Sequence, residues 1–108
     1  MGLGMESWEI IRSMVSRLAE NFHPRKIILF GSWARDEANS DSDVDLMVVV
    51  DSMGSRRDLR IAMRRAVTGM GLPKDIVVVT SQEYELKRNI PGSIVFPADR
   101  EGKVLYVA

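Results

Sequence analysis

The order of hydrophobic and polar positions predicts that helices and strands alternate along the chain. Between residues 7 and 22 the hydrophobic positions recur at helical spacing, which is typical of an amphipathic helix, and Pro24 ends it. Short runs rich in Val, Ile and Leu predict buried strands, and a last short strand follows Gly102. The four predicted strands are Lys26–Phe30, Val44–Val50, 75–80 and Lys103–Val107.

Further helices are predicted between these strands. Ser55 and the acid three residues later form a Ser-x-x-Asp capping pattern, which predicts that a helix begins after Ser55. Gly69 and Gly71 mark the expected end of that helix. Residues 81–88 favour a helix, and Pro91 ends it or begins another. The pattern therefore predicts an α/β fold (equally described as α+β), in which helices pack on a small sheet of about four strands.

Length and composition limit the possible classes of protein. The chain has 108 residues, 45% of them hydrophobic, so we expect one folded domain over residues 1–108. It has no Cys and only one His, which excludes thiolate chemistry and a multi-histidine zinc site. The longest apolar run, 46–50, is too short to cross a bilayer, and no signal-peptide pattern begins the chain. We therefore expect a cytoplasmic protein.

The charge is balanced in total but divided into separate clusters. Residues 36–51 contain six acids and no base, whereas residues 56–65 contain five arginines and one acid. An acidic cluster beside a basic one suits a site for metal ions and polyphosphate, although a solvated helix face also explains the arginines. The net charge of zero argues against a dedicated nucleic-acid binder.

The strongest candidate for chemistry is a set of aspartates at the starts of strands. Asp43 and Asp45 are two residues apart, so both side chains project to the same side of a strand. Asp75 begins the next strand and joins them if the two strands are neighbours. Such carboxylates repel one another unless a cation lies between them, and Mg²⁺ is the natural occupant. The alternative is that each Asp merely begins a strand.

The glycine after the first strand adds a second candidate. Gly31 lets the backbone approach a ligand closely, and the Ser32 hydroxyl can bind the same phosphate group. Alone, this pair is a weak signal for a phosphate loop. Trp33 in the same loop either packs beneath it or flanks a nucleotide base.

Together, these motifs resemble the signature of the DNA polymerase beta-type nucleotidyltransferase superfamily. The stretches 31–35 (GSWAR) and 42–46 (SDVDL) resemble the signature of the minimal nucleotidyltransferases within it. Residues 91–95 and 100–106 resemble the tail of that subfamily, so the resemblance covers nearly the whole chain. One position departs from the pattern, because Asp36 stands where the family has glycine.

The resemblance implies a mixed sheet with a polymerase beta-like core, and a reaction that moves AMP from ATP to a hydroxyl. The residues implied to bind the nucleotide are Gly31, Ser32, Arg35 and Ser42. Those implied to hold two Mg²⁺ ions and to act in catalysis are Asp43, Asp45 and Asp75. Ser42 is further expected to orient Asp43 by a hydrogen bond.

The resemblance also implies a protein partner. Minimal nucleotidyltransferases are typically paired with a helical HEPN-class protein, and the transferase modifies a tyrosine of that toxin and silences it. We therefore expect an antitoxin of a type VII-like toxin–antitoxin pair, in a homo- or hetero-oligomer. The alternative is a catalytically weak or inactive domain that binds nucleotide or partner and neutralises by contact, which only Asp36 favours.

Overall fold

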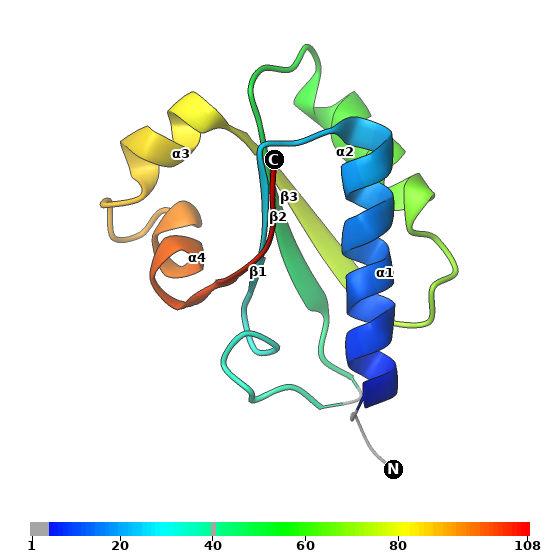
Figure 1. Ribbon diagram of the computed structural model, residues 1–108. Helices are drawn as coiled ribbons and strands as arrows, with labels where there is room; N and C mark the ends of the chain where they lie inside the picture. Colours follow the sequence, from blue (N-terminus) through cyan, green and yellow to red (C-terminus); the bar gives the residue numbers. More distant parts are fainter. Residues whose placement is uncertain (1–4, 40) are drawn as a thin grey trace.

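The computed structural model describes residues 5–39 and 41–108, so residue 40 of the expected loop lies outside the described part. One sheet and its flanking helices make up the fold (Figure 1). The helices are α1 (Met5–Phe22), α2 (Arg56–Ala66), α3 (Ser81–Lys87) and α4 (Val95–Glu101). The strands are β1 (Lys26–Phe30), β2 (Val44–Val50), β3 (Lys74–Thr80) and β4 (Lys103–Val107). The four predicted strands are confirmed, with β3 beginning one residue earlier than expected.

The sheet is mixed, as the resemblance implied. Its strand order is β3-β2-β1-β4; β1 is antiparallel to β2 and β4, and β2 is parallel to β3. Phe30 pairs with Asp45, and Asp45 pairs with Asp75. The end of β1 and the starts of β2 and β3 therefore lie together at one end of the sheet, at the bottom of Figure 1.

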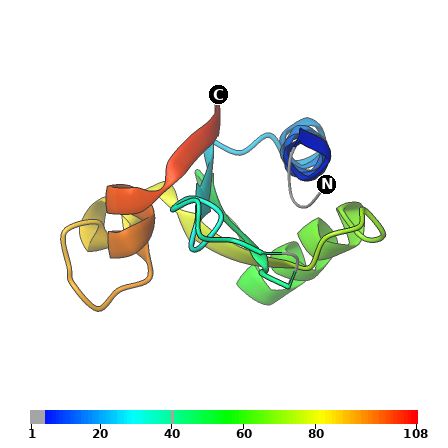
Figure 2. The same ribbon diagram turned by 90° about the horizontal axis from the view of Figure 1, so that it is seen from below.

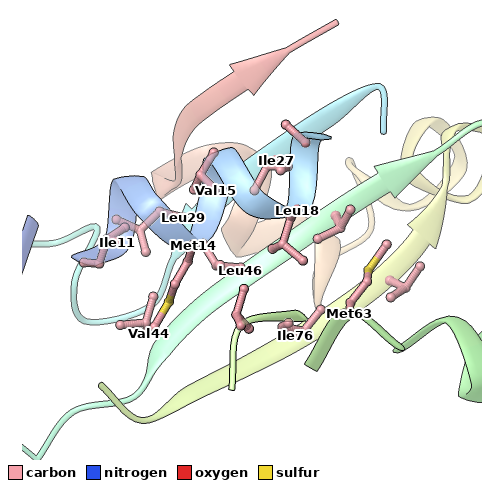
Figure 3. Close-up of a cluster of buried hydrophobic side chains, with 14 of the residues drawn as sticks. Ile11, Met14, Val15, Leu18, Ile27, Leu29, Val44, Leu46, Met63 and Ile76 are labelled. Carbon is pink, nitrogen blue, oxygen red and sulfur yellow. The ribbon is translucent and has the colours of Figure 1, made fainter. Parts of the chain in front are cut away.

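Helices α1 and α2 cover one face of the sheet, and α3 and α4 cover the other (Figure 2). Alternate residues of each strand point to opposite faces, so one strand contributes to two separate cores. The core beneath α1 and α2 is the larger (Figure 3). It includes Ile11, Met14 and Leu18 of α1, Met63 of α2, and Ile27, Leu29, Val44, Leu46 and Ile76 of the sheet.

The core on the α3 and α4 face is smaller. Its buried residues are Ile28, Met47, Val49, Val79, Tyr84, Val95 and Ala98. The hydroxyl of Tyr84 donates a hydrogen bond to the Asp99 carboxylate, which ties α3 to α4. This face is therefore held by two short helices that also bind each other.

The helix boundaries partly differ from those predicted. The Ser55 side chain accepts a hydrogen bond from the Asp58 N–H, which confirms the predicted cap. Helix α2 nevertheless ends at Ala66, before Gly69 and Gly71. The chain turns directly after Ala66, and both glycines have a positive φ, which does not continue a helix.

No helix in the described part of the chain is long and apolar enough to span a membrane.

Candidate active site

Three aspartates lie together at the start of β2 and β3. Asp45 and Asp75 are direct neighbours in the parallel register, so the condition under which Asp75 joins the other two aspartates is met. Asp43 precedes β2 and is exposed, whereas Asp45 and Asp75 are partly buried. Val44 is fully buried on the opposite face, so the side chains alternate as the sequence predicted.

The electrostatic surroundings of Asp45 are set by burial and by the neighbouring charges. Burial raises the pKa of Asp45 above its ordinary value, and the negative charges of Asp75 and Asp43 raise it further. The positive charge of Arg35 acts in the opposite direction. Folding therefore concentrates negative charge around Asp45, and a bound cation would relieve it.

The donors at this site suit Mg²⁺, although they do not form a finished metal cage. In residues 5–39 and 41–108, no three His, Cys, Asp or Glu side chains converge closely enough to form a ready metal site. Carboxylates without a counter-ion repel one another, which opposes such convergence. Asp43, Asp45 and Asp75 nevertheless offer only oxygen ligands, and Mg²⁺ needs one or two of these together with water and substrate phosphate.

The glycine of the predicted phosphate loop contacts the acidic site directly. Gly31 follows β1 with φ +76°, and a Cβ atom at this position would overlap the Asp45 carboxylate. Residues 31–37 then form a tight turn, in which the N–H of Ala34 donates to the Gly31 carbonyl and that of Glu37 to the Ser32 carbonyl. Only glycine satisfies both the backbone angle and the close approach.

Trp33 anchors this loop from below. Its ring is 3% exposed and meets Trp8 of α1 edge to face, with centroids 5.9 Å apart. Its Nε1–H donates to the carbonyl of Ser42, 3.4 Å away. Of the two predicted roles for Trp33, the structure supports packing beneath the loop. This packing couples the loop after β1 to the segment that carries Asp43.

Two of the predicted nucleotide-binding residues have other partners in the structure. The Arg35 Nε donates to Glu37 Oε1 at 3.0 Å, and an Arg35 terminal nitrogen lies 3.7 Å from Glu101. The Ser42 hydroxyl accepts from the Asn39 N–H at 3.0 Å, and no hydrogen bond to Asp43 is found among the described residues. In this structure the Ser42 hydroxyl closes the local turn, and its role in orienting Asp43 stays a prediction.

Asp36 is accommodated where the family has glycine. Its φ is +59°, in the left-handed region that glycine occupies most readily and that aspartate tolerates better than most residues. Its carboxylate lies 3.6 Å from the Lys103 ammonium. The charges that shift the pKa of Asp45 are those of Asp75, Asp43 and Arg35, and not that of Asp36. The substitution therefore keeps the backbone turn and places the extra acid beside a base.

A groove beside β3 was not anticipated from the sequence. It has a volume of about 680 Å³ and contains Asp75. Its other lining residues include Arg56 and Arg60 of α2, Lys87 of α3, and Ile90 and Ile94 between α3 and α4. The sequence signal was the arginine-rich helix, but its position relative to β3 depends on the fold.

Comparison with known proteins assigns the family. The model of the nucleotidyltransferase domain family matches residues 10–98. The chain belongs to this family. The predicted resemblance is thereby confirmed, and the chain is a nucleotidyltransferase by class. Protein adenylyltransferase MntA of Thermococcus cleftensis is 29% identical to it over 87 residues, which are 81% of this chain and 88% of that protein.

Solved structures confirm the fold of this nucleotidyltransferase. A Sulfolobus solfataricus protein assigned as a nucleotidyltransferase has a TM-score of 0.63 at 20% identity, covering 99% of this chain and 92% of that one. A mutant of the toxin–antitoxin MntA–HpeT has a TM-score of 0.58 at 19% identity, covering 89% and 72%. At these identities the likeness concerns the fold.

Proposed function

We propose that this nucleotidyltransferase is a Mg²⁺-dependent protein adenylyltransferase that moves AMP from ATP to a hydroxyl. The observation that carries the proposal is the meeting of the Gly31 turn with the paired acids Asp45 and Asp75. A loop able to bind a triphosphate thus lies against carboxylates able to bind the ions that accompany it. The similarity to MntA supports transfer to a protein.

The residues of the site have different roles in this reaction. Gly31, Ser32 and Arg35 hold the triphosphate, while Asp43 and Asp45 supply oxygen ligands for two Mg²⁺ ions, with Asp75 completing one of the two sites. When bound, these ions neutralise charge on the attacking and leaving oxygens. Asp75 accepts the proton of the acceptor hydroxyl, whose oxygen forms a bond to the α-phosphorus. The bond from that phosphorus to the β-phosphate oxygen breaks, and pyrophosphate leaves.

We further propose that the acceptor is a tyrosine of a HEPN-type helical toxin in the cytoplasm, so that this chain acts as its antitoxin. The fold likeness to an MntA–HpeT toxin–antitoxin structure supports this reading. The alternative of neutralisation by contact alone rested on Asp36. The left-handed backbone at this position and the nearby Lys103 accommodate that residue, which favours the catalytic reading.

The deciding experiment is a mass measurement on the partner. The chain is incubated with ATP, Mg²⁺ and the HEPN-type protein, and we expect a mass increase of one AMP group on a tyrosine. Replacing Asp43→Ala and Asp45→Ala together should slow transfer by at least about a hundredfold, because the developing charge loses its stabilisation. Chelation of Mg²⁺ with EDTA should have a similar effect.

The matched control takes two acids from the same segment. Asp41→Ala with Asp51→Ala removes the same charge from exposed positions outside the site and should leave transfer unchanged. Equal transfer by the Asp43/Asp45 variant and the wild type would refute the assignment. Silencing of the partner without ATP consumption and without an adduct would favour neutralisation by contact.

A further inference from the structure

The groove beside β3 continues directly from the acidic site. Its floor is formed by residues of β3, beginning at Asp75 and continuing through Val77 and Val79, which share the face of Asp45. Strand β3 is at the edge of the sheet, whereas the Gly31 turn follows β1, two strands away. The acids thus lie between the phosphate loop on one side and the groove on the other.

This order of elements suits a displacement reaction. In phosphoryl transfer the attacking and leaving oxygens lie roughly in line on opposite sides of the phosphorus. If the triphosphate occupies the Gly31 side, the acceptor must approach from the β3 side. The groove is the open space on that side, and a volume of about 680 Å³ is typical of sites that enclose a small ligand or short segment.

One wall of the groove is apolar and exposed. Ile90 is 51% exposed and Ile94 49% exposed, and both line the groove together with Pro91. Val77 of the floor is only partly covered. Neighbouring apolar side chains exposed beside a reaction site indicate a surface that a partner covers.

Basic side chains of α2 and of the end of α3 also line the groove. The Arg60 Nε donates to the carbonyl of Ile76 at 3.2 Å, and an Arg56 nitrogen donates to that of Val78 at 2.9 Å. These bonds occupy carbonyls along β3 and so oppose the pairing of another strand with this edge. Arg56 is also paired with Glu83, but Arg60 and Lys87 form no ion pair within the described residues.

We propose that this groove binds the segment of a partner protein that carries the acceptor hydroxyl. The segment has apolar side chains that cover Ile90 and Ile94, and acidic side chains that meet Arg60 and Lys87. It lies across the face of β3 and brings its hydroxyl to Asp75. The inference rests on the proposed function for the reaction itself, but the binding of the segment does not require catalysis.

The test measures binding of two fluorescein-labelled peptides by anisotropy. Each contains one tyrosine, flanked by Leu and Glu in the first peptide and by Ser and Lys in the second. We expect the Leu/Glu peptide to bind about tenfold more tightly. Ile90→Ser with Ile94→Ser should lower the affinity for the Leu/Glu peptide about tenfold. Lys87→Glu should reduce the preference for the Leu/Glu peptide over the Ser/Lys peptide. The affinity for a non-hydrolysable ATP analogue should not change.

Leu86→Ser is the matched control. Leu86 is 66% exposed on α3 and does not line the groove, so its replacement should leave both peptides unaffected. Equal affinity of the two peptides, or absence of binding up to about 1 mM, overturns the proposal. Loss of ATP-analogue affinity in the Ile90/Ile94 variant also overturns it, because the groove would then hold the nucleotide.

Failure of the groove and failure of the proposed function give different results. If AMP is transferred equally well by wild type and the Ile90/Ile94 variant, and peptide binding is unchanged, the groove assignment is wrong while the transferase stands. If the peptides bind as expected but no AMP is transferred to any acceptor, the groove stands and the proposed reaction is wrong.

Discussion

The two faces of the sheet differ in how completely helices cover them. Helices α1 and α2, with 18 and 11 residues, bury one face of β2 along its whole length, from Val44 to Val50. Helices α3 and α4 have seven residues each and bury only the later part of the other face, at Met47 and Val49. Asp45, at the start of that face, stays partly exposed.

The difference explains where chemistry can take place. Carboxylates beneath a fully packed helix would lose their hydration without compensation, which is costly. On the α3 and α4 face, the short helices leave the starts of β2 and β3 open, so Asp45 and Asp75 can meet solvent, cations and substrate. One face therefore provides stability, and the incompletely covered face provides the site and its groove.

The largest expected effect is on the free energy of unfolding, and two neighbouring valines of β3 on opposite faces of the sheet test it. Val78 is 2% exposed beneath α1 and α2, and Val78→Ala should lower the free energy of unfolding by about 2–3 kcal/mol, because it removes two buried methyl groups and leaves a cavity. Val77 is partly exposed on the groove floor, and Val77→Ala should cost less than about 1 kcal/mol. Urea unfolding of both variants measures the difference. Equal losses would contradict the contrast between the faces.

An intermediate effect is expected at the turn that closes the open end of the sheet. Gly31→Ala forces an L-residue into a left-handed conformation and pushes its Cβ into the Asp45 carboxylate. It should cost about 1–2 kcal/mol in unfolding free energy and strongly reduce AMP transfer. Gly54→Ala is the matched control, since its Cβ would meet no atom within 4 Å, and should be close to neutral. Full transfer activity in Gly31→Ala would contradict the role of this contact.

The smallest effect is a gain in stability on the open face. Asp45→Asn removes a charge that burial and two neighbouring acids disfavour, so it should make the protein slightly more stable at pH 7 while abolishing transfer. The pKa of Asp45 is higher in the folded chain than its ordinary value of 3.8. The charged Asp45 side chain therefore destabilises the wild-type protein fully above the folded-state pKa, and this destabilisation shrinks as the pH falls toward 3.8.

Thermal unfolding from pH 7 to pH 3.5 checks this sign. The gap between Asp45→Asn and wild type should narrow as the pH falls, because Asp45 is then increasingly protonated in both the folded and the unfolded state. Asp41→Asn, an exposed acid of the preceding loop, serves as the control and should show no such gap. A gap that widens toward low pH would mean that the folded protein favours the charged form of Asp45.

Local patterns were sufficient to predict the strands and part of the site. Strand periodicity placed Asp43 and Asp45 away from the buried Val44, and the glycine after β1 indicated the loop. Local patterns failed where competing local interactions decided the outcome. Helix α2 ends at Ala66 because turns replace its predicted last residues. Sequence spacing cannot rank such local alternatives, since each is worth only about 1 kcal/mol.

By itself, the sequence determined which residues form each strand and which of them share a face, because side chains alternate along any strand whatever surrounds it. Only the tertiary structure decided that β2 and β3 are parallel neighbours, with Asp45 beside Asp75 and Gly31 against Asp45. It also decided that the groove opens beside these acids. Strand order and helix coverage depend on contacts between residues far apart in the chain, and the burial of apolar surface across the whole sheet selects them.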